Sequence, residues 1–378
     1  MVQNYYYIIV GGGLAGLQLA LKLSKDIFFK GKSIAIIDPD PKEKNDKTWC
    51  FWEKGNGHWD HLVTHEWSRG KFISKDIDHN FELSPYYYKM LKSIDFYTYI
   101  KQELEKSEEI TFIKDEIQEI DPVTRKATGD KGEYTATHFF DSRVTSGYLE
   151  TEKHSRIYQH FKGRLIETEK PVFNSSEFTM MDFRLKYKDS TSFTYILPLS
   201  RTKALVEYTF FTPFLTEEKI YDELLDEYIS KYLKPGKYET LSTESGIIPM
   251  TDFPFESGNT TKITKIGTGG GWVKASTGYS FKNTEKKIEK IVDNIKSGVS
   301  PGSNLINYKF RRYDRIFLDV LYRNNELGEE IFTKFYTKNS PEEIFAYLDE
   351  ESSFSEDLKI MLSLYNFQFI KSFLRKGF

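Results

Sequence analysis

Residues 5–16 of the chain read YYYIIVGGGLAG, an apolar run that ends in closely spaced glycines. Residues 5–10 have the composition of a buried parallel strand. The spacing G-x-G-x-x-G follows directly, in Gly11, Gly13 and Gly16. The first glycine permits a tight turn, the second lets the backbone approach a pyrophosphate, and the third lets helix and strand pack closely. The stretch therefore predicts a dinucleotide-binding unit of the Rossmann type, within an α/β fold.

The residues that follow the glycines complete this unit. Leu14 and Ala15 open a helix, and its first free N–H groups and positive dipole end suit a phosphate. Residues 33–37 form a second apolar strand, which ends on Asp38. A carboxylate there can accept hydrogen bonds from ribose hydroxyls. The predicted dinucleotide-binding residues are Gly11, Gly13, Leu14, Ala15, Gly16 and Asp38, and this motif does not distinguish NAD from FAD.

Charge and composition narrow the function classes. The 378 residues suffice for two or three domains, and their formal net charge of −3 gives no general attraction to nucleic acid. The only cysteine is Cys50, which excludes an internal disulfide. No carboxylate or cysteine completes a usual ligand set around His58, His61 and His65, so no metal is expected.

The N-terminus and the hydropathy pattern bear on location. The first predicted strand begins almost at once, which leaves no room for a signal peptide. No apolar run reaches the length of a membrane span. We therefore expect a cytoplasmic protein.

The character of the chain changes several times after the first unit. Residues 86–105 are expected to be helical, whereas 193–197 and 204–211 have the pattern of strands in an antiparallel sheet. Residues 264–271 form another strand followed by glycines, which suggests a return to the first domain. From about residue 305 the pattern is mainly helical. The predicted domains are a discontinuous dinucleotide-binding domain, an antiparallel-sheet substrate domain and a helical C-terminal region, at 1–150 with 260–300, 151–259 and 301–378.

The aromatic content and the C-terminal tail each allow two interpretations. Aromatic residues make up 16% of the chain, which fits either a cavity for a large apolar ligand or a bias in base composition with aromatics filling ordinary cores. The tail, 360–378, mixes apolar residues with Lys371, Arg375 and Lys376. It fits either a basic amphipathic segment on a membrane surface or a terminal helix docked on the core.

Several stretches together resemble the bacterial-type, FAD-dependent lycopene β-cyclases. Beside the glycine motif, the resemblance lies in TWCFW at 48–52, MMDFR at 180–184, ALVEYT at 204–209, ESGIIPM at 244–250, the segment 267–281 and LDVLYR at 318–323. It covers nearly the whole chain. The glycine motif is common to many flavoproteins, but its combination with 204–209 and ASTGYS at 275–280 is far more specific.

The resemblance implies a fold like the flavin-dependent hydroxylases and geranylgeranyl reductases, with FAD, active in its reduced form, and NAD(P)H as reductant. It adds Gly267, Gly269 and Gly270 to the residues expected near the cofactor. Where the wider flavoprotein group has Gly-Asp, this chain has Gly267-Thr268, and Ala275 replaces a proline. These departures put the individual contacts with the ribityl chain in doubt.

The implied reaction converts the ψ-ends of lycopene, or of related acyclic carotenoids, to β-rings without net redox change. Because lycopene resides in bilayers, the resemblance also implies peripheral attachment to the inner face of a membrane. An FAD-dependent monooxygenase acting on another apolar substrate is the alternative, since the fold would be the same. A carotenoid- or dinucleotide-binding protein without catalysis is a third possibility.

Glu207 is the leading candidate for the acid that this reaction needs. It lies in an otherwise mainly apolar strand, and by alternation it shares a face with Leu205, Thr209 and Phe211. Burial raises a carboxyl pKa, as proton donation to an alkene requires, although a lone strand glutamate usually faces solvent. The resemblance favours the catalytic role, and the match to the family's glutamate motif is only partial.

Three further residues are candidates for the site. Asp252 is a second catalytic candidate, with turn capping as its ordinary alternative. Trp49 and Trp52 are substrate candidates, because aromatic faces stabilise a carbocation without trapping it. Ordinary packing is the alternative for both tryptophans.

Overall fold

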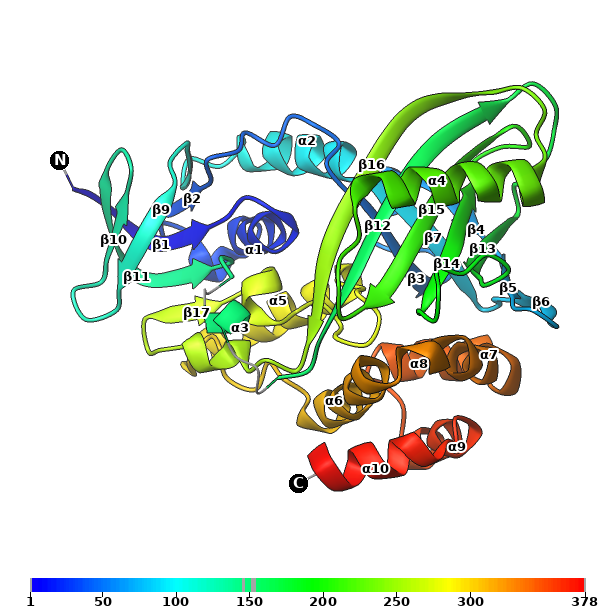
Figure 1. Ribbon diagram of the computed structural model, residues 1–378. Coiled ribbons are helices and arrows are strands. Elements are labelled where there is room, and N and C mark those ends of the chain that lie inside the picture. The colour runs from blue at the N-terminus through cyan, green and yellow to red at the C-terminus, as the bar shows by residue number, and fades with distance from the viewer. Residues whose placement is uncertain (1, 145–146, 151–153, 377–378) are drawn as a thin grey trace.

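The computed structural model describes residues 2–144, 147–150 and 154–376. Its first sheet has the order β8-β2-β1-β11-β10-β9, with β17 beside β11 (Figure 1). The strands β1, β2, β8, β11 and β17 are mutually parallel, and β10 and β9 extend the sheet as an antiparallel hairpin. Their bounds are β1 Gln3–Val10, β2 Ile34–Ile37, β8 Ile110–Ile113, β9 Ile117–Asp121, β10 Lys126–Gly129, β11 Glu133–Asp141 and β17 Ile263–Lys265. The predicted Rossmann-like α/β unit and the return of the chain after residue 260 are confirmed.

Three helices cover one face of this sheet. They are α1 Leu14–Ser24, α2 Ser93–Leu104 and α5 Phe281–Lys296. Their apolar sides form one core with the strands, because leucines of α1 pack with Phe96 of α2 and Ile291 of α5. The short helix α3, Gly147–Glu150, follows β11.

The second sheet is almost entirely antiparallel and has the order β16-β12-β15-β14-β13-β5-β6. Only β13 and β5 run parallel. The bounds are β16 Tyr238–Thr251, β12 Arg156–Thr168, β15 Lys203–Thr212, β14 Ser192–Pro198, β13 Glu177–Asp182, β5 Arg69–Ile73 and β6 Asp78–Glu82. Helix α4, Glu218–Tyr228, crosses the outer face of this sheet (Figure 1), where its leucines pack against β15. The expected antiparallel sheet is confirmed, with β14 and β15 at the predicted places.

A third, small sheet has the order β3-β7-β4. Its strands are β3 Thr48–Lys54, β7 Tyr86–Lys92 and β4 Val63–Trp67. The expectation of a helix over 86–105 was wrong for its first part, since β7 occupies 86–92 and α2 starts only at Ser93. The run of tyrosines there suits a strand, and it pairs with β3 and β4 on both sides. The predicted domain limits are also not followed everywhere, because β5 and β6 lie within 1–150 yet extend the second sheet.

Helices form the C-terminal part, as predicted. The helices α6 Tyr308–Arg323, α7 Gly328–Lys338 and α8 Pro341–Leu348 lie beneath the second sheet, and α9 Phe354–Ser363 and α10 Phe367–Lys376 lie beyond them (Figure 1). Helix α8 starts with a capping box between Ser340 and Glu343. Within the described residues, none of the helices combines the length and apolarity needed to cross a membrane.

Candidate active site

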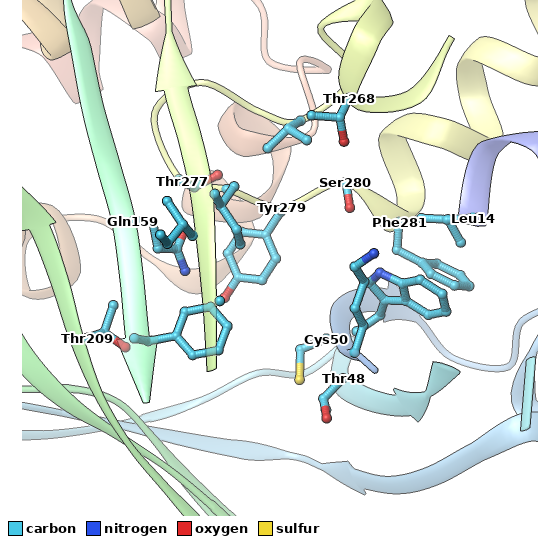
Figure 2. A pocket seen from close by; sticks show the side chains of 18 of the residues that line it. Leu14, Thr48, Cys50, Gln159, Thr209, Thr268, Thr277, Tyr279, Ser280 and Phe281 are labelled. Carbon is cyan, nitrogen blue, oxygen red and sulfur yellow. The ribbon is translucent and has the colours of Figure 1, made fainter. Parts of the chain in front are cut away.

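A cleft of about 610 Å³ lies where the first sheet, the small sheet, the second sheet and the C-terminal helices meet. Figure 2 shows its two ends. Leu14 and Phe281 lie at one end, Thr209 and Gln159 lie at the other, and Tyr279 and Cys50 lie between them. The cleft therefore joins the predicted dinucleotide unit to the face of the antiparallel sheet.

The glycine turn between β1 and α1 forms the first end of the cleft. Gly11 has a φ of 104°, and a Cβ there would lie 1.9 Å from Ser142 Oγ. A Cβ on Gly16 would lie 1.9 Å from the carbonyl oxygen of Gly11, so this glycine allows helix and strand to approach. Around Gly13, by contrast, no atom lies within 4 Å of a Cβ position, so space remains on the cleft side.

The N-terminus of α1 and the end of β2 provide groups that fit a dinucleotide. Helix α1 begins at Leu14 without a capping side chain, so its first N–H groups are available to a phosphate. The carboxylate of Asp38 accepts a hydrogen bond from the Gly12 N–H at 2.6 Å and lines the cleft. Lys42, which the sequence analysis did not single out, adds a cation to the same end. All six residues predicted from the motif line the cleft, and together they fit a dinucleotide cofactor.

Of the three glycines predicted near the cofactor in the returning segment, only Gly267 lines the cleft. Gly267 has a φ of 55° and lines the cleft, and a Cβ there would lie 3.1 Å from that of Ala15. Gly269 and Gly270 are buried and outside the lining, which corrects their expected place at the cofactor. A Cβ on Gly269 would lie 2.3 Å from the carbonyl oxygen of Arg143, and one on Gly270 would lie 2.5 Å from that of Lys265. These two glycines let the turn pack on the ends of β11 and β17.

Two carboxyl groups lie side by side at the other end of the cleft. Glu207 of β15 and Glu244 of β16 are both register partners of Gly163, on the strand β12 between them. A Cβ on Gly163 would lie 3.5 Å from Glu207 Cβ and 3.3 Å from Glu244 Cγ. Gly163 places no side chain between its two neighbours, both carboxyl groups line the same cleft, and the charge of one acts on the other.

The environment of Glu207 favours its protonated form. Only 7% of the residue is exposed, and the alternation along β15 places Leu205, Thr209 and Phe211 beside it in the cleft lining, as predicted. Burial, and next the charge of Glu244, raise the pKa of Glu207 to about 8. The Thr209 hydroxyl, 2.6 Å from Glu207 Oε1, acts in the opposite direction.

Glu244 has a similar environment, and the sequence analysis missed it. Burial raises its pKa, and the Thr48 hydroxyl, which donates a hydrogen bond to it at 2.8 Å, lowers it. In the part of the chain that the structure describes, no cation forms an ion pair with Glu207 or Glu244. A signal existed, since Glu244 is the first residue of the ESGIIPM segment that carries the family resemblance.

Three tyrosines form a hydrogen-bonded cluster in the middle of the cleft. The hydroxyl of Tyr88 lies 2.8 Å from that of Tyr195 and 2.7 Å from that of Tyr279. Burial raises the pKa of all three well above the usual value, and it raises the pKa of the adjacent Cys50 to about 12. These groups are therefore neutral, and they offer aromatic faces to a cation without an anionic oxygen or sulfur that would capture it.

The two tryptophans predicted at the substrate have different positions. Trp49 lines the cleft, where it packs edge-on against Phe96 and Tyr97. Trp52 is outside the lining, which favours ordinary packing, the alternative for this residue. It stacks on Phe345 at 4.7 Å, and its indole N–H donates to Asp349 at 2.9 Å, so its contacts are those of a core residue.

Asp252, the second predicted catalytic residue, is also outside the cleft lining. It follows the end of β16, and its side chain is only 2% exposed. One carboxylate oxygen lies 3.0 Å from Arg315 Nε and the other lies 3.3 Å from His154 Nδ1. The structure therefore does not bring Asp252 together with Glu207. Among the described residues, no cluster of three or more His, Cys, Asp or Glu side chains could hold a metal ion.

Solved structures share this fold at low sequence identity. A geranylgeranyl bacteriochlorophyll reductase-like protein from Thermoplasma acidophilum has a TM-score of 0.61 at 11% identity, with 99% of this chain and 100% of that chain covered. The flavin-dependent brominase Bmp2 has a TM-score of 0.64 at 12% identity over 99% and 100% of the two chains. For a 2-methyl-3-hydroxypyridine-5-carboxylic acid oxygenase the values are 0.63 and 11%, over 92% and 96%. This likeness concerns the fold, and it confirms the predicted fold type.

The sequence family is a separate finding. No curated protein matches the chain. The family described as "Lycopene cyclase protein" matches residues 7–374, which is nearly the whole chain and includes both ends of the cleft. The chain therefore belongs to the lycopene cyclase family.

Proposed function

We propose that the protein is a lycopene β-cyclase, an isomerase that converts the ψ-ends of lycopene to β-rings with reduced FAD and with NAD(P)H as the source of electrons. The observation that supports this most is Glu207, a buried carboxyl in a mainly apolar cleft. Its pKa is raised to about 8, and among the described residues it has no ion-pair partner. Proton addition to an alkene requires a neutral acid held close to the hydrocarbon.

The proposed reaction has three steps and no net redox change. A proton adds to C2 of the ψ-end, which leaves a carbocation at C1. The C5=C6 double bond attacks C1, and the new bond closes the ring. Loss of a proton from C6 then gives the β-ring, so the substrate and the product have the same mass.

Glu207 donates the first proton in this scheme. Burial, and next the charge of Glu244 across Gly163, keep the pKa of Glu207 high. The proton lost from C6 returns to this pair of carboxyl groups, so the pair holds the same number of protons before and after the reaction. The neutral tyrosine cluster and Trp49 stabilise the cation through their aromatic faces.

FAD fits the other end of the cleft. Gly11, Gly13, the N-terminus of α1 and Asp38 would hold its pyrophosphate and ribose, since they line the cleft and the space beside Gly13 is open. When bound in its reduced, anionic form, the cofactor supplies negative charge that lowers the energy of a cation in the cleft. Leu14 and Phe281 lie at this end of the cleft and help to exclude water.

The rest of the cleft is suited to a hydrocarbon. Its apolar lining comes from both sides, with the sheet contributing Phe161, Met180 and Leu205 and α7 contributing Phe332 and Phe335. Contacts of this kind bind an apolar ligand without directional hydrogen bonds. Other acyclic carotenoids with ψ-ends fit the same description.

We also propose peripheral attachment at the cytoplasmic face of a membrane, through α9 and α10. Helix α10 is docked on α6, since Ser372 donates to the Ile316 carbonyl at 3.1 Å and Arg375 pairs with Asp319. The docked alternative for the tail is thus confirmed, yet Phe354 and Phe367 remain 71% and 59% exposed. Such apolar side chains bind an interface, and sedimentation with liposomes should show binding that Phe354→Asp together with Phe367→Asp weakens.

The test of the function is expression in a bacterium that accumulates lycopene, followed by pigment analysis. We expect γ-carotene or β-carotene of unchanged mass. A product with added oxygen would support the monooxygenase instead. Unchanged lycopene beside soluble, flavin-loaded protein would contradict the cyclase proposal.

A further inference from the structure

A second apolar cavity lies among the C-terminal helices. This helical groove has a volume of about 280 Å³ and is formed by the helices α6 to α10 and by residues 276–277. Aromatic and aliphatic side chains dominate its lining. They are Phe317, Ile331, Phe332, Phe335, Ile360, Leu364, Phe369 and Ile370. Asp314 is the one carboxyl group in the lining, and it is paired with Lys274 at 3.0 Å.

The helical groove and the active-site cleft are neighbours. Thr277, Phe332 and Phe335 line both of them, so one layer of side chains lies between the two cavities. Phe332 and Phe335 belong to the same helix, α7, and both are buried. These two rings therefore form part of the wall between the cavities.

The outer side of the groove is formed by apolar side chains that water reaches. Tyr365 is 63% exposed, Ile370 is 42% exposed and Met361 is 38% exposed, and all three line the groove. They belong to the same two helices that carry the proposed membrane face, α9 and α10, and to the connection between them. Apolar patches of this kind on a protein mark an interaction site.

We propose that the helical groove is the access site for the acyclic carotenoid, which passes through it from the bilayer into the cleft between Phe332 and Phe335. This inference rests on the proposed function. A long, rigid polyene whose end reaches Glu207 extends well beyond the carboxyl pair, and its remainder needs an apolar environment. The groove supplies one, continuous with the cleft on its inner side and with exposed apolar residues on its outer side.

The test fills the groove. Leu364→Trp adds bulk inside it, and Leu362→Trp places the same side chain at a position that is 65% exposed and outside the lining. Both variants are compared with the wild type in liposomes that contain lycopene, with flavin content and melting temperature measured for each. We expect Leu364→Trp to lower the rate of cyclisation about tenfold, as loss of well-packed ligand contacts does, while Leu362→Trp stays near the wild type.

The outcomes separate this inference from the proposed function. Wild-type activity together with a Leu364→Trp variant as active as Leu362→Trp would overturn the access site and leave the cyclase standing. A flavin-loaded wild type that neither binds nor cyclises lycopene would overturn both. If Leu364→Trp loses its flavin, Ile370→Trp at the exposed rim, with Leu374→Trp as its control, decides by the same criterion.

Discussion

Two acidic regions lie at strand β16, and they differ in whether basic side chains are close to the carboxyl groups. Glu244, within the strand, lies across Gly163 from Glu207 in the cleft, and no ion pair to either carboxyl is formed by the described residues. Asp252, one residue beyond the strand, lies within 3.3 Å of His154 and 3.0 Å of Arg315. Glu207 and Asp252 are both buried and Glu244 is half-buried, so burial alone does not distinguish the two regions.

The difference shows what makes a buried carboxyl a proton donor. Burial raises the pKa of a carboxyl group, and a neighbouring cation lowers it again. In the cleft, the neighbour of Glu207 is another carboxyl group, which acts in the same direction as burial. At Asp252 the partners are basic side chains, which is the arrangement of a structural ion pair.

Glu207→Gln should have the largest effect on ring formation. The amide keeps the size of the side chain but cannot donate an acidic proton, so we expect a loss of about 10²–10⁴-fold in rate with FAD retained. Glu239→Gln, an exposed position on β16, is the matched control and should have no effect. Normal cyclisation by a flavin-loaded Glu207→Gln variant would exclude this residue as the acid.

The pH dependence should separate the two cleft carboxyls. The acid must be protonated, so the rate should be full at lower pH and fall as the pH rises through about 8, the pKa of Glu207. Glu244→Gln removes a negative neighbour, which lowers the pKa of Glu207 and moves this fall to lower pH. The measurement is the rate of cyclisation as a function of pH, with lycopene in liposomes, for the wild type and for Glu244→Gln. A fall at the same pH in both proteins would show that Glu244 does not act on Glu207.

These predictions depend on contacts that a sequence pattern does not contain. The glycine motif predicted the first strand, turn and helix well, because its spacing fixes this local structure. Alternation along one strand predicted the face of Glu207. The ESGIIPM segment marked the region of Glu244, but its position opposite Gly163 depends on the register of three strands from distant parts of the chain.

The sequence-based errors have the same origin. Gly269 was expected at the cofactor because it lies in a glycine run, but the fold turns it towards the Arg143 backbone. Trp52 was expected in the cavity, but Phe345, almost three hundred positions later in the chain, stacks on it. The tyrosines of β7 fit a strand only when β3 and β4 lie on its two sides.

Gly163→Ala should have an intermediate effect. The new methyl group would lie 3.1 Å from Leu205 Cδ1 and 3.3 Å from Glu244 Cγ, so the carboxyl pair has to shift. Overpacking of this kind costs about 1–3 kcal/mol, and we expect a several-fold lower rate with FAD still bound. Kinetics measure the cyclisation rate, and thermal melting measures the loss of stability. An unchanged rate would show that the spacing of the two carboxyls is not important.

Asp252→Asn should have the smallest effect on ring formation. Unlike Glu207→Gln, it should lower the stability of the protein more than its activity. Asparagine keeps the shape of the side chain but leaves Arg315 and His154 without their carboxylate. Because Arg315 is 38% exposed and water partly screens it, we expect a loss of about 1–2 kcal/mol in the free energy of unfolding, with the cyclisation rate changed less than about threefold at a temperature where the variant is folded. Thermal melting and pigment analysis on the same preparation provide the comparison. If this variant melts like the wild type but no longer forms rings, Asp252 does not have a structural role. It then takes part in the reaction, although it lies outside the cleft lining.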